Sequence, residues 1–590
     1  MQRAHRAPVA RSGELLCGQD SLLVRSLAVV ATLVATSDDV VDLAVLPPDL
    51  CQILLDHLCF HQAAQAVSAR ALACFAADAS VANCIFRIAL RPPDTQSKVN
   101  ALAWHVDDAF FDTLPRFSSL EVLELGSCFK LTDEPLSRTL RAAPLLRVLD
   151  VDRCKLIGDA GLAPIAEGAT GRLEELLVGG TRASMIFLAL GPRLLKLRTL
   201  DACGQRGMTD SALLSLCNCN HLASHTAAGV LPPPLPPPSL LLPMLPPPPP
   251  PAPMPTPPSP ATTPPPPPAA AAAAVAAAPP AAAAAATAPP PPPLTSQPPP
   301  PPALPPPPPL LPVIDLSGLP APTGPLPLCC LGLASCAISD AGCSALTALG
   351  PTLTSLDLSF NPRVTHGVFL CGLPQLTSLD LSLNAWVDDD VAVHLGSSLP
   401  RLQRLVLEKT ELSDGGVAAL SALGPSLTYL DLSRTNVYGT LDSLASLGRM
   451  AQLATLLLAY TGVDMALAHH LPPSLRHLKL SRCLLFDDDA LRRLADELCA
   501  YAPTSVPPSP RASLTALDLG SPGITDAAIP ALQMISDAGL LSLTLWHSKM
   551  THLGAARLVA ATGLALDMSM NSTEGTFLLH REEEARGSGA

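Results

Sequence analysis

The chain has 590 residues, of which 68 are proline and only 15% are charged. This composition excludes a uniformly globular chain and requires a low-complexity region. Aromatic residues make up 3%, so the core has to be built mainly from aliphatic side chains. The net charge of -13, without a lysine and arginine run that could follow a phosphate backbone, argues against nucleic acid as a partner.

The amino-terminal residues 1–40 are expected to be poorly ordered or helical. Residues 21–36 are the most apolar stretch near the start, but this stretch is too short to span a bilayer and contains Arg25. We therefore predict a buried helix there and no membrane partner. A targeting peptide is the alternative, because three arginines precede the apolar run.

Residues 45–58 (VLPPDLCQILLDHL) predict an amphipathic helix that follows a pair of prolines. Its apolar residues Leu50, Ile53, Leu54 and Leu58 have the spacing of one helix face. We assign this helix to a helical segment over residues 41–114.

One phrase, LxxLxLxx followed by Asn, Cys or Thr, recurs along the chain and predicts a repeat protein. Clear copies begin at Leu120, Leu146, Leu173, Leu197, Leu328, Leu353, Leu376, Leu402, Leu427, Leu453, Leu475, Leu514 and Leu540, and a degenerate copy ends at Asn571. Within each block the copies start mostly about 22 to 27 residues apart, which is the range of leucine-rich repeats.

Each repeat is expected to supply one short strand and one helix, and to bury its apolar edge only by stacking on its neighbours. The fold class is therefore α/β, a leucine-rich-repeat solenoid or horseshoe. We predict a first block of repeats at 115–228, a second at 328–572 and a tail at 573–590. The sequence leaves open whether the two blocks form one solenoid.

An aspartate follows the first leucine of most copies by about 12 or 13 residues and precedes a helical run of small residues. A carboxylate at that point can cap the free amides of a helix, so we interpret these aspartates as N-caps. They are Asp133, Asp159, Asp210, Asp340, Asp389, Asp414, Asp488 and Asp526. We favour the same capping role over metal binding for the runs 388–390 and 487–489.

The repeats with a cysteine at the ninth position resemble the cysteine-containing leucine-rich repeats of F-box proteins, over residues 115–222 and 328–572. The resemblance implies that the ninth side chain turns inward and bonds neighbouring backbone. This role would fall to Cys128, Cys154, Cys336, Asn361, Asn384 and Cys483. The scattered cysteines indicate reduced thiols, hence the cytoplasm, with the nucleus or a cytoskeletal or ciliary axoneme location as alternatives.

Residues 45–58 also resemble the opening of an F-box, which docks on a Skp1-type adaptor of a ubiquitin ligase. The resemblance implies adaptor-facing roles for Leu46, Pro47, Leu50, Ile53 and Leu54. The tryptophan usually found near the end of that motif is missing here. A helix that closes the first edge of the solenoid is the alternative, and both roles can hold at once.

Residues 229–327 are dominated by proline and alanine, and we predict a disordered, extended insertion there. Its proline runs beside leucine are candidate ligands for profilin, SH3 or WW surfaces. The alternative is compositional drift without a binding role, or an error in the gene model.

The strand side of the repeats is the predicted binding face, with the fifth residue of each phrase pointing away from the core. A row of carboxylates there favours a basic protein target. The row comprises Glu124, Asp150, Asp201, Asp357, Asp380, Asp431 and Asp518, with Lys479 as the exception. Aromatic anchors are predicted at Phe360, Tyr429, Tyr460 and Trp546.

We find no phosphate-binding loop, HExxH, GxSxG or CxxC pattern, so no catalytic residue, metal ligand or cofactor is predicted and the chain is not expected to be an enzyme. We expect protein–protein interaction, with substrate recognition in an SCF-type ubiquitin ligase as the first hypothesis. The second is a structural scaffold of the cytoskeleton or ciliary axoneme without a ubiquitin role.

Overall fold

A computed structural model describes residues 22–36, 41–61, 69–90, 108–184, 186, 194, 196–217, 327–463, 465–483, 486–499, 514–568 and 578–579. All of them belong to one unit, which comprises Met1–Leu231 and Ala321–Ala590. The insertion predicted at 229–327 lies outside the described residues except for Pro327, and so does the tail at 573–590 except for residues 578–579.

The described strands form one sheet in which every strand pairs with the next in sequence. The strands are β1 (Arg87–Ala89), β2 (Val122–Glu124), β3 (Val148–Asp150), β4 (Glu175–Leu177), β5 (Thr199–Asp201), β6 (Cys330–Gly332), β7 (Ser355–Asp357), β8 (Ser378–Asp380), β9 (Arg404–Val406), β10 (Tyr429–Asp431), β11 (Thr455–Leu457), β12 (His477–Ser481), β13 (Ala516–Gly520), β14 (Ser542–Leu545), β15 (Ala565–Asp567) and β16 (Leu578–Leu579). β1 to β15 run parallel, whereas β16 is antiparallel to β15. Because β1 and β16 stand at the two ends of this order, the sheet is open.

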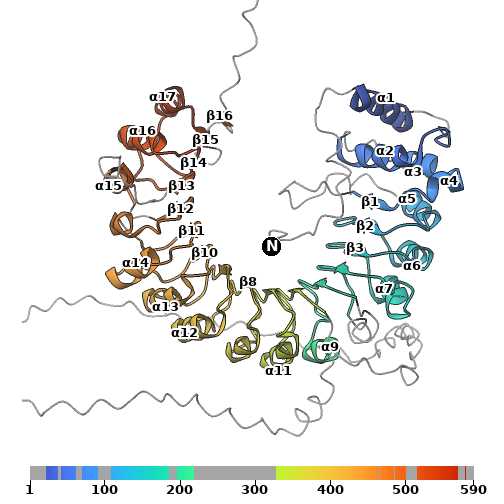
Figure 1. The fold of residues 1–590 in the computed structure, drawn as a ribbon, viewed down its shortest axis with the longest axis horizontal. Helices are drawn as coiled ribbons and strands as arrows, with labels where there is room; N and C mark the ends of the chain where they lie inside the picture. The colour runs from blue at the N-terminus through green and yellow to red at the C-terminus, as the bar shows by residue number, and fades with distance from the viewer. Residues whose placement is uncertain are drawn as a thin grey trace, which may run out of the picture. The chain divides into compact units, whose positions relative to one another are not determined.

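The helices of the repeats lie along one face of this sheet (Figure 1). The amino-terminal helices are α1 (Leu22–Thr36), α2 (Pro48–His61), α3 (Ala69–Ala76), α4 (Ala79–Ala82), α5 (Asp108–Thr113) and η3 (Leu114–Arg116). The first block has α6 (Asp133–Ala142), α7 (Asp159–Ala166) and α9 (Asp210–Leu216). The second has α11 (Asp340–Ala345), η4 (Leu346–Leu349), η5 (Val368–Gly372), α12 (Asp389–Ser398), α13 (Asp414–Leu420), η6 (Ser421–Leu423), α14 (Leu441–Gly448), η7 (Met465–His470), α15 (Asp488–Cys499), η8 (Asp526–Ala528), α16 (Ile529–Asp537) and α17 (His552–Thr562).

The leucines of the phrase build the core, as the sequence predicts. Leu353, Leu356 and Leu358 of one copy are fully or almost fully buried. The leucine at the fourth position of each phrase stands in register with its equivalent in the next repeat, as Leu356 does with Leu379. Each buried leucine contributes about 1.5 to 3 kcal/mol, and only a stacked neighbour can provide that burial.

The two blocks of repeats form one continuous sheet, which answers the question that the sequence left open. β5 pairs with β6 in parallel register, with Thr199 opposite Cys330 and Asp201 opposite Gly332. The Cys336 thiol donates to the Ala202 carbonyl over 3.3 Å. Residues 218–326 therefore interrupt the sequence of the array without interrupting its ladder of hydrogen bonds.

The sheet begins earlier than the sequence predicts, because β1 lies inside the segment 41–114 that we expected to be helical. The prediction of a buried helix over residues 21–36 is right for one face of α1 only. Ala31 and Val34 are buried, whereas Val29 is 70% and Leu33 is 54% exposed. Among the described residues, no helix combines the length and the apolar character that crossing a membrane requires.

The N-cap prediction for the repeated aspartates is wrong by one residue. The helices begin at these aspartates, and the N-cap is the preceding residue, for example Thr209 before α9 or Ser339 before α11. Thr209 accepts a bond from the Ala212 amide, so the first turn of α9 has a cap of its own. The aspartate side chain is thus free to serve the next repeat.

Each of the eight carboxylates accepts a backbone N–H from the next repeat, over 2.6 to 3.0 Å. We call these contacts inter-repeat aspartate bonds. Their pairs are Asp133 with Gly158, Asp159 with Ser184, Asp210 with Ser339, Asp340 with Thr365, Asp389 with Ser413, Asp414 with Gly439, Asp488 with Thr525 and Asp526 with Thr551. Many partners also donate a hydroxyl to the second oxygen, as Ser339 does over 2.6 Å.

The two aspartate runs do cap helices, as predicted, through their first residue. Asp388 accepts the Val391 amide over 3.1 Å at the start of α12. Asp487 accepts the Ala490 amide over 2.9 Å at the start of α15. Within the described ranges, no group of three or more histidine, cysteine or acidic side chains could hold a metal ion.

Candidate protein-binding surface

The strand side of the sheet carries the third and fifth residues of each phrase, because the fourth and sixth point into the core. The exposure that we predicted for the carboxylates at the fifth position is wrong for most of them. Glu124, Asp150, Asp357, Asp431 and Asp518 are buried, and Asp201, Asp380 and Lys479 are half-buried.

The aspartates are buried because their carboxylates fold back onto the turn that ends the strand. Asp357 accepts the Ser359 amide over 2.9 Å and the Ser359 hydroxyl over 2.7 Å. Equivalent amide bonds run to Asp150, Asp201, Asp380 and Asp431 from the residue two positions later. The carboxylates satisfy donors that no strand partner reaches, so their first role is to form the turn.

The burial of this row has an electrostatic consequence. Loss of hydration, with the neighbouring Asp380 carboxylate as a second cause, raises the pKa of Asp357 to about 6. Burial also raises the pKa of Asp431, and burial followed by the charge of Asp431 raises that of Glu408. These groups hold their negative charge less readily than exposed carboxylates do.

The charges of the strand side differ between its two ends. At β2 to β5 the outward residues include the acids Glu124, Asp150, Glu175 and Asp201. At β9 to β14 they include Arg404, Lys479 and the aromatic rings of Tyr429 and Trp546, which are half-buried. At this end, cations and aromatic rings therefore stand beside the acids of the predicted row, in which Lys479 was the expected exception.

Cations and aromatic rings stack on one another at the β9 to β14 end. The Arg404 guanidinium lies 3.5 Å from the centre of the Tyr429 ring. Arg434 lies 4.3 Å and Arg482 lies 5.5 Å from the centre of the Tyr460 ring. Stacking of this kind holds a guanidinium in place while its N–H edge remains free to donate.

Lys479, the exception in the predicted row of acids, belongs to the same cluster. Its ammonium pairs with Asp518 over 2.9 Å and lies 5.6 Å from the centre of the Trp546 ring. Asp518 also accepts the Ser481 hydroxyl over 2.6 Å. The negative charge of Asp518 is thus already matched inside the protein.

A second row of residues stands at the eighth position of the phrase. Only two of its members, Phe360 and Tyr460, were predicted from the sequence as binding residues. Each residue has a positive φ, between 50° and 63°, and each is exposed. We call this row the turn ridge, and its members are Phe360, Leu383, Lys409, Arg434, Tyr460, Arg482 and His547. At the same position the first block has Ser127, Arg153, Gly180 and Gly204, and for the two glycines this conformation is free of strain.

The turn ridge could have been found by aligning the copies and reading the eighth column alone. That column is small or glycine in the first block apart from Arg153, and it is large from Phe360 onward apart from Ser521. The alternation of the strand places the third and fifth residues on the exposed side, but it does not place a residue of the following turn.

The inward roles implied for the ninth position are confirmed by the hydrogen bonds and the burial of these side chains. Asn361 donates to the Leu333 and Leu358 carbonyls over 2.9 Å each, and Asn384 makes the equivalent pair of bonds one repeat later. The thiols of Cys154, Cys336 and Cys483 donate to carbonyls of the preceding repeat, and Cys128 is fully buried. Burial raises the pKa of Cys154 and of Cys336 to about 12, so both are structural thiols rather than nucleophiles.

The residues implied as adaptor-facing lie on or just before α2, but they do not share one accessible face. Leu54 is fully buried in the core, while Leu46, Leu50 and Ile53 are half-buried and Pro47 is exposed. The buried face of α2 also includes Leu58, which belongs to the predicted stripe, and Cys51 and Leu55, which lie one position away from members of it. Leu54 is therefore unavailable to a partner in this structure, because it packs against the rest of the protein.

Gln52 holds α2 against the first strand of the sheet. Its amide oxygen accepts the backbone N–H groups of Phe86 and Arg87 over 3.0 and 3.1 Å, and its nitrogen donates to the Arg87 carbonyl over 2.9 Å. These bonds serve backbone groups at β1, the first strand of the sheet. The helix thus covers part of the edge that the first repeat leaves open.

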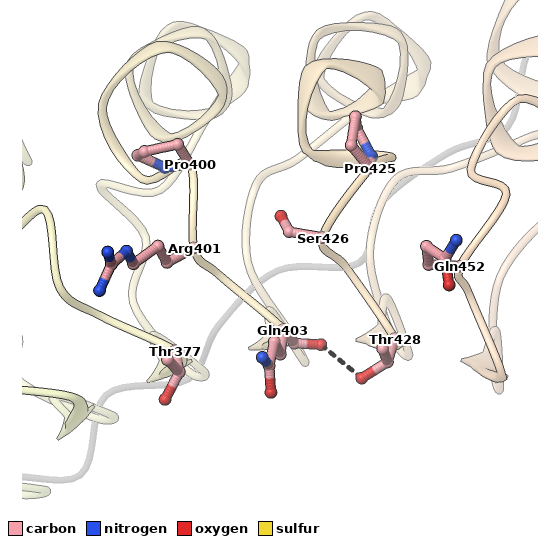
Figure 2. A pocket seen from close by; sticks show the side chains of 8 residues that line it. All are labelled: Thr377, Pro400, Arg401, Gln403, Pro425, Ser426, Thr428 and Gln452. Atoms are coloured by element: carbon pink, nitrogen blue, oxygen red, sulfur yellow. Dashed lines mark hydrogen bonds between the residues drawn. The ribbon is translucent and has the colours of Figure 1, made fainter.

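An open hollow of about 600 Å³ lies where the helices of two repeats return to the strands (Figure 2). Its walls are Thr377, Pro400, Arg401, Gln403, Pro425, Ser426, Thr428 and Gln452. The Thr428 hydroxyl donates to the Gln403 carbonyl over 3.0 Å, and Arg401 bonds Gln375 over 2.6 Å. These residues supply no acid and base pair, so the hollow is not a candidate catalytic site.

Comparison with known families identifies the repeats. A family model described as leucine-rich repeat matches residues 142–166 and 351–365, which contain β3 with α7 and β7. The chain thus carries leucine-rich repeats, a module suited to binding other proteins, and no catalytic family is indicated. No curated protein sequence matches the chain.

Several solved structures are similar in fold. An internalin from Listeria monocytogenes is 13% identical, with 90% of this chain and 100% of that chain covered and a TM-score of 0.35. The Rad7 and Elc1 complex in yeast is 15% identical, with 77% and 83% covered and a TM-score of 0.39. A Leptospira interrogans leucine-rich-repeat protein is 11% identical, with 82% and 96% covered and a TM-score of 0.33.

Proposed function

We propose that this protein binds another protein through the strand side of its second block of repeats. The observation that carries the proposal is the turn ridge, where large exposed side chains occupy a backbone conformation that favours glycine. Phe360 is 52% and Leu383 is 43% exposed, and they lie on adjacent repeats. Apolar side chains held outward in this way suit contact with a partner better than contact with water.

Site-specific crosslinking in the full chain tests this proposal. A photoreactive residue is placed at Leu383 on the turn ridge or, as the matched control, at Val393, an exposed apolar residue of α12 on the helix side. We expect a discrete crosslinked partner from position 383 and none from position 393. Equal crosslinking from both positions, or none from 383, contradicts a binding role of the strand side.

We further propose that the bound protein is a substrate and that the chain presents it to an SCF-type ubiquitin ligase. Support for this role comes from the resemblance of residues 45–58 to the opening of an F-box. Of the residues implied by that resemblance, Pro47 is exposed and Leu50 is half-buried, so both can take part in a contact. The buried Leu54 has to act by holding α2 in place.

Capture of the full chain by a purified Skp1-type adaptor tests this narrower role. Leu50→Asp is expected to abolish capture, while Val393→Asp on α12 serves as a control for an added surface charge. Failure of the wild-type chain to be captured, while a genuine F-box protein is captured, rejects the ligase role. A structural scaffold without a ubiquitin role is then the better function, and α1 to α3 serve only to cover the first strand.

A further inference from the structure

We infer that the turn ridge and its stacked cations bind an extended acidic segment of a partner protein with an apolar residue at one end. This inference rests on the proposed function and names the chemistry of the partner. It replaces the basic target that the carboxylate row predicted. Most acids on the strand side of β9 to β14 are already bonded within the protein, whereas its cations have donors to spare.

The acids in this region are occupied inside the protein. Glu408 pairs with Arg434 over 3.3 Å, and Asp518 pairs with Lys479 over 2.9 Å. Asp431 is buried and accepts the Ser433 amide over 2.9 Å. A basic partner would have to compete with these internal bonds for every carboxylate.

The cations of the turn ridge are exposed and have more donors than these internal bonds use, including Arg434, whose pair with Glu408 involves only its Nε. Lys409 is exposed and has no ion-pair partner among the described residues. Arg434 and Arg482 flank the Tyr460 ring, which fixes their planes without using all of their N–H groups. Arg482 also donates to His547 over 2.5 Å, which holds its side chain along the ridge. Guanidinium groups positioned in advance favour carboxylates because little side-chain entropy is lost on binding.

The order of the ridge sets the order of the partner's residues. Phe360 and Leu383 come first and are apolar, and Lys409, Arg434 and Arg482 follow along β9, β10 and β12. Neighbouring strands lie about 4.8 Å apart, so the row from β7 to β12 extends over about 24 Å. An extended chain rises about 3.3 Å per residue, and roughly eight residues therefore match this length.

The positive charge of the turn ridge is local, because the whole protein is acidic, with a net charge of -13. Long-range attraction therefore does not bring an acidic partner to this chain, and recognition has to come from short-range contacts with Lys409, Arg434 and Arg482. Added salt is expected to weaken such contacts, because exposed charge pairs are screened within about 10 Å at moderate ionic strength.

Fluorescence anisotropy with the full chain tests the inference. The probe is a labelled peptide of about ten residues with one phenylalanine followed by glutamates and aspartates. A peptide with lysine in place of each acid and a single-stranded DNA of similar length are the comparisons. The variants are Lys409→Glu and Arg482→Glu, and the matched control is Arg401→Glu, whose side chain lines the hollow of Figure 2.

We expect the acidic peptide to bind and each ridge variant to weaken it by at least about tenfold, as loss of a contacting charge does at interfaces. Arg401→Glu is expected to leave binding unchanged, and Lys409→Arg to retain it. These results together support the inference, provided that all variants keep the wild-type circular dichroism spectrum.

Other outcomes overturn the inference, and they separate it from the proposed function. Preference for the lysine peptide or for DNA rejects an acidic protein segment as the ligand. Absence of peptide binding, while position 383 still crosslinks a partner, also rejects it but leaves the strand side as a binding face. Absence of both peptide binding and crosslinking rejects the proposed function as well.

Discussion

The bond between Asp210 and Ser339 is the most informative contact to remove, because it joins the two blocks of repeats across residues 218–326. The Asp210 carboxylate accepts the Ser339 amide over 2.7 Å and the Ser339 hydroxyl over 2.6 Å. The same pair of bonds joins Asp340 to Thr365, over 2.8 and 2.6 Å, between repeats that no insertion separates. Asp340→Ala is thus a matched control for Asp210→Ala.

The expected loss follows from the two bonds. A hydrogen bond to a charged group contributes about 1.5 to 3 kcal/mol, and the half-buried position of Asp210 favours the lower end. Asp210→Ala should therefore lower the free energy of unfolding by about 3 kcal/mol. In a repeat protein this loss falls on one interface between neighbours, here the interface between β5 and β6.

The position of the loss distinguishes the two variants. In sequence, the repeats on either side of Asp340 follow each other directly, whereas the connection from β5 to β6 includes residues 218–326. Closing a longer connection costs more entropy. We expect Asp210→Ala to split urea unfolding into two transitions and Asp340→Ala to shift a single one. Circular dichroism gives the transitions, and hydrogen exchange at the Cys330 amide, which bonds the Arg198 carbonyl, locates the opening.

A double-mutant cycle measures the coupling energy between Asp210 and Ser339 directly. Asp210→Ala, Ser339→Ala and the double variant isolate the hydroxyl bond, and their coupling energy is expected to be about 1 to 2 kcal/mol. A coupling energy near zero, or identical unfolding of Asp210→Ala and wild type, shows that the bond does not hold the blocks together.

Three further predictions use the same measurements. Gly342→Ala in α11 should destabilise the protein by about 1 to 3 kcal/mol, because the new Cβ would overlap the Asp210 carboxylate. This loss is expected even though alanine favours helices, and an unchanged urea midpoint contradicts it. Asn384→Ala should cost about 3 kcal/mol, since it removes the acceptor of the buried Asn361 amide and a donor to the Leu381 carbonyl, while the Leu358 carbonyl keeps the Asn361 side chain. A loss below about 1 kcal/mol argues against that role. Asp357→Asn should raise the melting temperature near neutral pH but not near pH 4. Burial raises the pKa of Asp357 to about 6, so the folded state binds the proton more tightly than the unfolded state does. The destabilisation of the folded state by the ionised carboxylate therefore grows as the pH rises from about 4 to 6. Equal effects of Asp357→Asn at both pH values would show that the burial of the charge is not the cause.

Much of the fold was predictable because each repeat solves the same packing problem. The buried leucines, the parallel strands and the inward Asn361 and Asn384 all follow from one phrase that every copy shares. The continuity of the sheet was not predictable, because it depends on the pairing of Thr199 with Cys330, whose phrases are separated by a segment of unrelated composition.

The aspartates show where reasoning from one repeat fails. A single repeat offers Asp340 only its own helix as a partner, so the N-cap was the natural prediction. In the stacked array the next repeat brings the Thr365 amide and hydroxyl to the same carboxylate. Ser339 remains in the N-cap position, and Asp340 becomes a bond between repeats.

The exposure predicted for the fifth position was wrong for a related reason, and its burial points to the turn ridge. The alternation of a strand predicts which side a residue faces, but it does not predict whether a short acid such as Asp357 folds back onto its own turn. Once the fifth position is occupied in this way, the outermost side chains are those of the eighth position, whose positive φ turns them away from the strand. A backbone conformation that costs about 1 to 3 kcal/mol in a residue other than glycine is retained across Lys409, Arg434 and Arg482. In the first block Gly180 and Gly204 avoid that cost, although Arg153 has the same conformation there. The turns of the second block therefore present more large side chains to a partner than those of the first block do.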